Sequence, residues 1–256
     1  MPSWDSNQYL RFVAERTRPA EDLAARISVQ SPSRVIDLGC GPGNSTAVVA
    51  LRWPAAELTG LDSSAAMVES SRRSSSSITW SVGDIATWST TTPYDVIFSN
   101  AALQWVPDHA SLLPRLMKCV VPGGALAFQV PANFDAPGHQ LIRSISSSDR
   151  WRHQFRSAVR EWHVEEPSFY YDSLATCSRT VDLWTTEYFH VMPGPDAIVE
   201  WYRGTGLRPW LDALPDEVAR TRFCDDYLDE ITRAFPPQND GKVLFPFRRL
   251  FVIAYR

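Results

Sequence analysis

One segment, residues 34–46, constrains the fold most, because an apolar β-branched run passes into glycines and then into helix-capping residues. It reads Arg34-Val35-Ile36-Asp37-Leu38-Gly39-Cys40-Gly41-Pro42-Gly43-Asn44-Ser45-Thr46. Glycine at alternate positions allows positive φ and lets a ligand approach the backbone without a Cβ in the way. Asn44, Ser45 or Thr46 is then expected to cap the following helix. The segment therefore predicts a strand, a tight loop at the edge of a nucleotide site, and a helix.

The spacing of this loop argues against a bound phosphate. Sites that hold a pyrophosphate at a helix N-terminus have the pattern G-x-G-x-x-G, whereas this loop reads G-x-G-x-G with Asp37 two residues before it. A carboxylate there favours a cationic ligand, such as a sulfonium amino acid. A lone glycine-rich strand exit is more often an ordinary tight turn. Two further predicted strands also end in acids, Asp62 and Asp84, and together the three acids indicate one site.

Strand and helix patterns alternate along the first half of the chain, which predicts a doubly wound α/β sheet of mostly parallel strands. The expected elements are strand 34–38, helix 44–51, strand 57–61, helix 64–72, strand 78–82, strand 94–99, helix 109–119 and strand 125–130, with a turn at Pro122-Gly123-Gly124.

The pattern changes after Pro131. Residues 135–161 read as helical, strands are expected at 180–190 and 243–255 as an antiparallel pair at the sheet edge, and helices fill 196–235 between them. We expect a single domain over 1–256 whose parts are an N-terminal helical lid at 1–30, a cofactor-binding half at 31–131, a helical cap insertion at 132–178, and C-terminal strands and helices at 179–256 that complete the sheet and substrate pocket. Ligands of such sheets bind beyond the carboxyl ends of the strands.

Composition limits the partners. A net charge of −4 over 256 residues argues against a broad surface for polyanions, so nucleic acid is not expected as a partner. No stretch approaches the roughly 20 apolar residues of a membrane span. The four cysteines, Cys40, Cys119, Cys177 and Cys224, are far apart and predict reduced, buried thiols and a cytoplasmic setting. We expect a monomer or weak dimer.

The glycine loop and the three acids resemble those of class I S-adenosylmethionine-dependent methyltransferases, which have a Rossmann-like sheet. The resemblance implies that Asp62 takes the two ribose hydroxyls, and that Asp84 and the backbone of Ile85 meet the adenine. S-adenosylmethionine is the implied cofactor, S-adenosylhomocysteine its product, and no metal is expected. The cofactor-binding residues so implied are Asp37, Gly39, Cys40, Gly41, Gly43, Asn44, Asp62, Ser63, Met67, Asp84, Ile85, Asn100 and Ala101.

Blocks at both ends and in the middle of the chain are similar to the trans-aconitate methyltransferases. They are Trp4-Asp5, Tyr9-Leu10-Arg11-Phe12, Glu15-Arg16-Thr17-Arg18-Pro19-Ala20, Gly43-Asn44-Ser45-Thr46, Arg52-Trp53-Pro54-Ala55-Ala56, Ser99-Asn100-Ala101-Ala102-Leu103-Gln104-Trp105-Val106-Pro107-Asp108-His109, Val181-Asp182-Leu183-Trp184, Thr205-Gly206-Leu207-Arg208-Pro209-Trp210-Leu211 and Arg249-Leu250-Phe251. This resemblance implies a carboxyl O-methyltransferase that forms the monomethyl ester of trans-aconitate or a related small polycarboxylate.

An ionised carboxylate is already a nucleophile, so methyl transfer to it needs no general base and we assign no catalytic residue. The enzyme must orient the acid and neutralise its other carboxylates, for which the planar fork of arginine is suited. The predicted acid-binding residues are Arg16, Arg18, Gln104, Trp105, His109, Tyr171, Arg208 and Arg249. The alternatives are surface positions for the arginines, with Pro19 giving Arg18 a helix-start role, core packing for Trp105, and a helix start after the N-cap Asp108 for His109.

Tyr170, Tyr188 and His190 are expected to pack in the core rather than line the pocket. Other functions stay open at this point. One is a methyltransferase for another small acid, or for an amine or hydroxyl of a natural product, although a hydroxyl acceptor needs a base or a metal. Another is an aromatic-rich protein that binds S-adenosylmethionine without catalysis, against which the intact Asp37, Asp62 and Asp84 argue.

Overall fold

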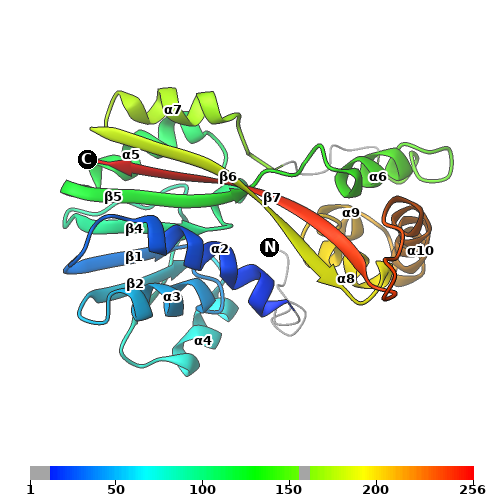
Figure 1. Ribbon diagram of the computed structural model, residues 1–256, viewed down its shortest axis with the longest axis horizontal. Helices are drawn as coiled ribbons and strands as arrows, with labels where there is room; N and C mark the ends of the chain where they lie inside the picture. Colours follow the sequence, from blue (N-terminus) through cyan, green and yellow to red (C-terminus); the bar gives the residue numbers. More distant parts are fainter. Residues whose placement is uncertain (1–11, 156–161) are drawn as a thin grey trace. The chain divides into compact units, whose positions relative to one another are not determined.

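The computed structural model describes residues 12–155 and 162–256. A seven-stranded sheet has the strand order β3-β2-β1-β4-β5-β7-β6 (Figure 1). The first five strands are parallel and β7 runs antiparallel to β5. The strands are β1 (Arg34–Leu38), β2 (Glu57–Asp62), β3 (Thr79–Val82), β4 (Tyr94–Asn100), β5 (Val120–Pro131), β6 (Thr180–Met192) and β7 (Val243–Tyr255). The predicted fold class is confirmed.

Helices follow the strands as expected for crossover connections between parallel strands. They are α2 (Val13–Arg26), α3 (Asn44–Arg52), α4 (Ala65–Ser74), α5 (His109–Lys118), α6 (Pro137–Ser146), α7 (Pro167–Ala175), α8 (Pro195–Arg203), α9 (Arg208–Asp212) and α10 (Glu217–Ala234), with a 3₁₀ turn η1 (Leu103–Trp105). β4 is buried at nearly every position because helices cover both faces of a parallel sheet.

The chain forms two compact units, which we describe separately. The sheet unit comprises residues 13–131, 162–186 and 249–256, and the helical unit comprises, among the described residues, 12, 132–155 and 187–248. Strands β6 and β7 pass through both units. The domain boundaries expected from the sequence stay a prediction, and residues 1–11 of the expected lid and 156–161 of the expected cap lie outside the described residues.

Within the sheet unit, α2 and α7 lie on opposite faces of the sheet. Phe128 of β5 packs its ring against Tyr170 of α7, with the ring centroids 5.4 Å apart. On the other face, the guanidinium of Arg26 in α2 lies 4.2 Å above the Trp184 ring, which stacks on Phe251. The end of α2 is at the amino edge, because the Ser28 N–H donates to the Tyr255 hydroxyl. The N-terminal half of α2 therefore lies nearer the carboxyl edge of the parallel strands (Figure 1).

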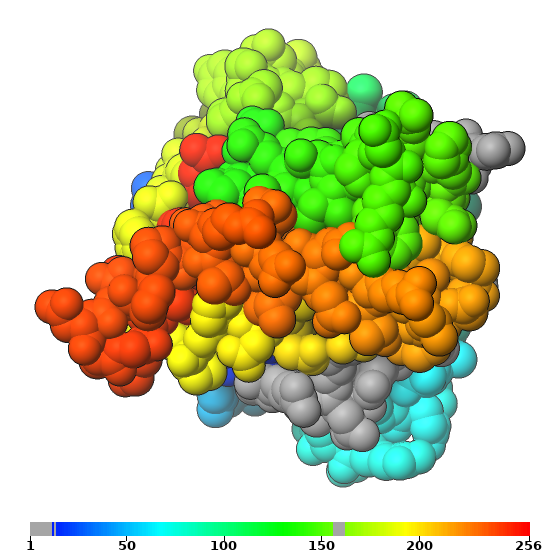
Figure 2. Space-filling model, turned by 90° about the vertical axis from the view of Figure 1, so that its right-hand side faces the viewer, coloured from blue at the N-terminus to red at the C-terminus, as the bar shows by residue number. Residues whose placement is uncertain are grey.

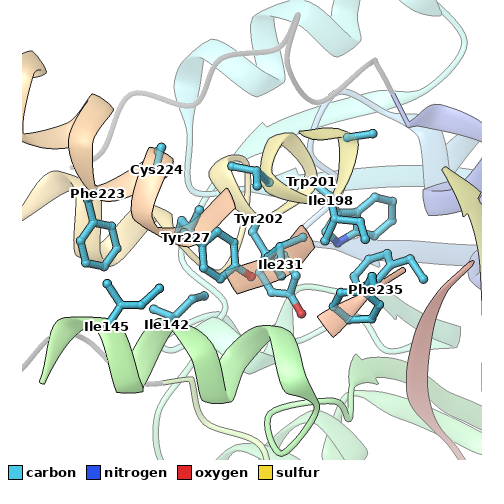
Figure 3. Packing of buried hydrophobic residues seen from close by; sticks show 14 of the residues in the cluster. Ile142, Ile145, Ile198, Trp201, Tyr202, Phe223, Cys224, Tyr227, Ile231 and Phe235 are labelled. Atoms are coloured by element: carbon cyan, nitrogen blue, oxygen red, sulfur yellow. The ribbon is translucent and has the colours of Figure 1, made fainter. Parts of the chain in front are cut away.

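The helical unit has its own aromatic core, drawn in Figure 3. Ile142 and Ile145 of α6 face Phe223 and Tyr227 of α10, and the Tyr227 hydroxyl donates to the carbonyl of Gly138. A Cβ at position 138 would overlap the side chain of Tyr202, so glycine lets α6 approach this core closely. On the surface of this unit, the green α6 lies beside the orange α10 (Figure 2).

Three local expectations from the sequence are wrong. β5 begins at Val120 and continues through the expected turn at residues 122–124, with Gly123 at φ +84°. The expected long helix over 135–161 ends at Ser146, within a serine-rich run whose side chains compete for backbone hydrogen bonds. Pro19 lies inside α2 rather than at its start. α7, which begins with Pro167 at its first position, lies within the helical cap expected at 132–178, although its own bounds were not predicted from the sequence.

In the part of the chain that the structure describes, no helix is long and apolar enough to cross a membrane. All four cysteines are free thiols; Cys40, Cys119 and Cys224 are buried, whereas Cys177 is partly exposed.

Candidate functional site

The glycine loop after β1 is shaped by positive φ and close packing. Gly39, Gly41 and Gly43 have φ of +77°, +54° and +98°. A Cβ on Gly39 would overlap that of Ala102, which follows β4. The Gly39 N–H donates to the Leu61 carbonyl over 2.7 Å and so ties the loop to the end of β2. Glycine is thus required at position 39 both by conformation and by space.

Asp37 is buried just below the loop. Its Oδ2 accepts hydrogen bonds from Ser45 Oγ at 2.6 Å and Thr46 Oγ1 at 2.7 Å. Burial raises the pKa of this carboxyl to about 6, against the effect of the two hydroxyls. Its Oδ1 is buried and has no hydrogen-bond partner among the described residues. An acceptor without a partner at this depth fits a cationic ligand group.

The expected capping of α3 by Asn44, Ser45 or Thr46 is wrong. The N-cap is Gly43, which has no side chain to accept a hydrogen bond. The hydroxyls of Ser45 and Thr46 point to Asp37 instead, because the loop turns the first residues of α3 over the end of β1.

Asp62 connects the end of β2 to the glycine loop. Its Oδ2 accepts from the Gly41 N–H at 2.9 Å and its Oδ1 accepts from the Ser64 N–H at 2.8 Å. Ser64 is the N-cap of α4 and accepts from the Met67 N–H. Each carboxylate oxygen of Asp62 keeps a further lone pair. The acid therefore stiffens the loop and still has capacity to accept bonds from ligand hydroxyls.

Asp84 follows β3 at the same edge of the sheet. Its Oδ1 accepts from the Ala86 N–H at 2.9 Å, which closes a tight turn after the strand. The Arg115 guanidinium donates to the carbonyls of Ile85 and Ala86 and holds this turn from α5. Ile85 is buried, and Asp84 is exposed. The structure thus brings the three strand-end acids to one edge, as the parallel register of β1, β2 and β3 requires.

The segment after β4 is strained. Ala101 has φ +54°, a conformation that costs an L-residue about 1–2 kcal/mol. Its N–H donates to the Gln129 carbonyl, and its own carbonyl accepts from Gln104 Nε2 at 2.7 Å. Asn100 is buried with its Oδ1 lacking a partner among the described residues. Trp105 is half-buried, with its ring centroid 5.8 Å from that of Trp162.

His109 is buried and held at both ring nitrogens. Its Nε2 lies 2.9 Å from the Leu103 carbonyl, which can only accept, so Nε2 carries the proton. The Tyr170 hydroxyl, 3.0 Å from Nδ1, is then the donor to Nδ1, and its oxygen accepts from the Glu165 N–H. Burial lowers the pKa of His109 and raises that of Tyr170 to about 12. Asp108 caps α5, which confirms the helix-start interpretation.

The predicted core residues Tyr170, Tyr188 and His190 are buried, Tyr188 and His190 in the helical unit. Tyr171 is 51% exposed on α7. Its predicted contact with substrate stays a prediction.

The four candidate arginines differ in burial. Arg16 of α2 is 6% exposed and Arg249 of β7 is 3% exposed, which is rare for arginine. Arg249 Nη1 donates to Gln129 Oε1 at 3.1 Å. Arg18 is exposed, and Arg208 belongs to the helical unit, where its Nε lies 3.8 Å from Asp212 Oδ2.

Sequence reasoning missed Gln129, which is fully buried in β5. The available signal was a single amide in the otherwise apolar run Ala125–Val130. Among the described residues, no group of three or more His, Cys, Asp or Glu side chains could hold a metal ion.

A sheet of this strand order, with a glycine loop after β1 and acids at the carboxyl ends of β1, β2 and β3, defines a class I S-adenosylmethionine-dependent methyltransferase. The family model described as a methyltransferase domain matches residues 9–183. The chain is 46% identical to trans-aconitate 2-methyltransferase of Azoarcus sp. strain BH72, covering 100% of both chains. It is 47% identical to the enzyme of that name from Methylobacterium radiotolerans, covering 99% of this chain and 98% of that one. The chain belongs to the trans-aconitate 2-methyltransferase family.

Solved structures share the fold at low sequence identity. The YcgJ protein of Bacillus subtilis superposes with a TM-score of 0.59 at 15% identity, covering 93% of this chain and 99% of that chain. Phosphoethanolamine N-methyltransferase 2 of Haemonchus contortus, solved with S-adenosyl-L-methionine, has a TM-score of 0.55 at 14% identity. The match covers 93% of this chain and 52% of that chain. These similarities support the fold alone.

Proposed function

We propose that this protein transfers the methyl group of S-adenosylmethionine to a carboxylate of trans-aconitate, or of a closely related small polycarboxylate. The products are the monomethyl ester and S-adenosylhomocysteine. The observation that carries this proposal is the 46% identity to a trans-aconitate 2-methyltransferase over the whole of both chains. Two buried arginines in the sheet unit, Arg16 and Arg249, add the chemistry that an acid substrate needs.

The residues at the carboxyl edge of β1, β2 and β3 fit the cofactor. When bound, S-adenosylmethionine supplies a methyl group made electrophilic by a sulfonium. The buried Oδ1 of Asp37 has an open position for an ammonium group, and Asp62 has lone pairs for ribose hydroxyls. The loop at Gly41 offers close backbone approach, since a Cβ there would meet nothing within 4 Å. The remaining residues of the predicted cofactor set stay predictions.

Acid binding in the sheet unit rests on Arg249 and Arg16. The ionised acid needs no proton removed before it attacks, because carboxyl pKa values near 4 leave it charged at neutral pH. Arg249 can offer its planar fork to two carboxylate oxygens and thereby align the acid. We assign no base role to His109, whose two ring nitrogens have partners within the protein, and its predicted contact with the acid stays a prediction. The contacts predicted for Arg18, Gln104, Trp105, Tyr171 and Arg208 stay predictions.

The test is a transfer assay with methyl-labelled S-adenosylmethionine and separate acids: trans-aconitate, cis-aconitate, citrate, malonate and a fatty acid. Label on trans-aconitate that is released as methanol in mild base would establish a carboxyl ester. Label on malonate or the fatty acid alone would move the protein to another acid. Cofactor binding without any labelled acid would favour an amine or hydroxyl acceptor, or a non-catalytic binding protein.

A cytoplasmic location and a monomeric or weakly dimeric state are proposed with this function. The free thiols of all four cysteines are consistent with a reducing compartment. Size-exclusion chromatography with light scattering at two protein concentrations tests the oligomeric state.

A further inference from the structure

Gln129 occupies a position where an apolar residue would be expected. It lies in β5 with no exposed surface, between Asn100 of β4 and Phe251 of β7 in the register of the sheet. Side chains at one register position point to the same face. This is the face that α2 covers, since Arg26 of α2 lies over Trp184 and Trp184 stacks on Phe251. Gln129 is two residues from the end of β5, close to the edge where ligands of such sheets bind.

The direction of the Gln129 amide follows from its partner. A guanidinium has only donors, so the atom that faces Arg249 Nη1 at 3.1 Å is the oxygen, Oε1. The amide nitrogen Nε2 therefore points away from Arg249. Nε2 is buried and has no hydrogen-bond partner among the described residues. Its N–H groups can bond only to an acceptor.

Such a buried donor is unfavourable unless an acceptor arrives. A buried amide without a partner loses the hydrogen bonds that water gave it in the unfolded chain. The nearest residue in register, Asn100, also has an amide oxygen without a described partner, yet the two amides form no hydrogen bond with each other. The donor of Gln129 and the acceptor of Asn100 thus stay available to different ligand groups.

We propose that Gln129 is an acid-binding residue, whose Nε2 donates to a carboxylate oxygen of the substrate while its Oε1 holds Arg249 toward the same acid. The inference rests on the proposed function, because it assumes an acid substrate at Arg249. A carboxylate supplies the acceptor that Nε2 lacks, and a hydrogen bond to an ionised group is among the stronger kinds. Asn100, one strand away, offers an acceptor and so suits the cationic cofactor instead.

Two variants separate the roles of the amide oxygen and the amide nitrogen. Gln129→Glu keeps an oxygen for Arg249 but removes the donor and adds a charge that repels the acid. Gln129→Leu removes both and leaves the charge of Arg249 in place. Both lack the donor, so both are expected to raise the KM for trans-aconitate at least about tenfold. The dissociation constant for S-adenosylmethionine, measured by calorimetry, is expected to stay within about twofold.

The control is Gln30→Glu, which makes the same charge change at an exposed glutamine of the sheet unit. It is expected to keep the wild-type KM. If Gln129 had a purely structural role, its substitutions would lower cofactor affinity and acid affinity together. The melting temperature of Gln129→Glu, which retains an oxygen for Arg249, measures any structural effect separately.

The inference is overturned if Gln129→Leu keeps the wild-type KM. This includes the case in which only Gln129→Glu raises the KM, because the effect would then come from the added negative charge and not from the loss of the amide donor. It is also overturned if both variants weaken cofactor binding as much as acid binding. A wild-type protein that esterifies no acid overturns the proposed function and this inference together, whereas a reactive wild type with unaffected variants overturns the inference alone.

Discussion

The Nδ1 atom of His109 lies 3.0 Å from the hydroxyl oxygen of Tyr170, and this contact joins the start of α5 to α7 within the sheet unit. Tyr170→Phe leaves a buried acceptor without a donor, so we expect the free energy of unfolding to fall by about 1–3 kcal/mol. Denaturant unfolding followed by fluorescence measures this change. The neighbour Tyr171 is 51% exposed, and Tyr171→Phe is the matched control with an expected change under about 0.5 kcal/mol. Equal effects of the two substitutions would contradict the role of the buried pair.

Two glycines of the same loop are expected to respond differently to alanine. Gly41→Ala adds a Cβ that meets nothing within 4 Å, so only the positive φ of +54° penalises it, by about 1–2 kcal/mol. Gly39 also has a positive φ, of +77°, and the Cβ that Gly39→Ala adds would overlap the Cβ of Ala102. We therefore expect Gly39→Ala to lower the free energy of unfolding by at least about 1–3 kcal/mol more than Gly41→Ala does. Unfolding of both variants without cofactor compares these costs. A smaller loss for Gly39→Ala than for Gly41→Ala would refute the packing of the loop on the segment after β4.

Asp37→Asn is expected to stabilise the cofactor-free protein and weaken cofactor binding. Burial raises the Asp37 pKa from its usual 3.8 to about 6, so the folded protein binds more protons than the unfolded chain between these values. The wild-type free energy of unfolding therefore decreases as pH rises through this window and stays reduced above it. Removing the charge should recover about 1–3 kcal/mol at pH 7.

The same substitution removes the charge that we propose attracts the ammonium group of the cofactor, so the dissociation constant for S-adenosylmethionine should rise at least about tenfold. Unfolding at pH 7 and calorimetric titration test the two effects separately. A less stable variant, or one with unchanged cofactor affinity, would show that Asp37 has a different role.

Arg249→Lys tests the geometry of the proposed acid site rather than its charge. Lysine keeps the positive charge but loses the planar fork, so we expect the KM for trans-aconitate to rise about tenfold or more while cofactor affinity stays nearly unchanged. Steady-state kinetics and calorimetry give the two values. Arg73→Lys, at an α4 side chain that is 79% exposed, should leave both unchanged. Parallel losses of acid and cofactor affinity for Arg249→Lys would reject its assignment to the acid.

His139 is expected to make the helical unit sensitive to acid. Burial lowers its pKa from the usual 6.5 to about 3, so the unfolded chain binds more protons than the folded protein between these values. The free energy of unfolding therefore decreases as pH falls through this window, by at most about 1.4 kcal/mol per pH unit from this one group. His139→Gln should flatten the decrease between pH 6.5 and 5, measured by urea unfolding at several pH values. An unchanged slope would show that other groups dominate.

The sequence alone determined the alternation of strands and helices in the first half of the chain, and it predicted the edge of the sheet at which the strand-end acids lie. The apolar runs of β1, β2 and β4 are interrupted by Gly39, Asp62 and Asn100 at the points where each strand ends, and that local pattern needs no knowledge of distant contacts. Parallel pairing then brings the ends of those strands to one edge, which is why Asp37, Asp62 and Asp84 could be assigned together.

Only the tertiary structure decided which side chains meet across long separations. Ser45 and Thr46 are residue types that often cap helices, but folding places Asp37 within reach of their hydroxyls. The hydroxyls therefore donate to the Asp37 carboxylate, because an ionised carboxylate is a stronger acceptor than a neutral group. Pro19 stays inside α2 although proline is a poor residue for helix interiors, because tertiary packing overrides local propensity. Gln129 and Arg249 are 120 residues apart and meet only because β5 and β7 pair. Local patterns carry no information about such pairs, since burial and hydrogen bonding depend on the neighbours that the complete fold supplies.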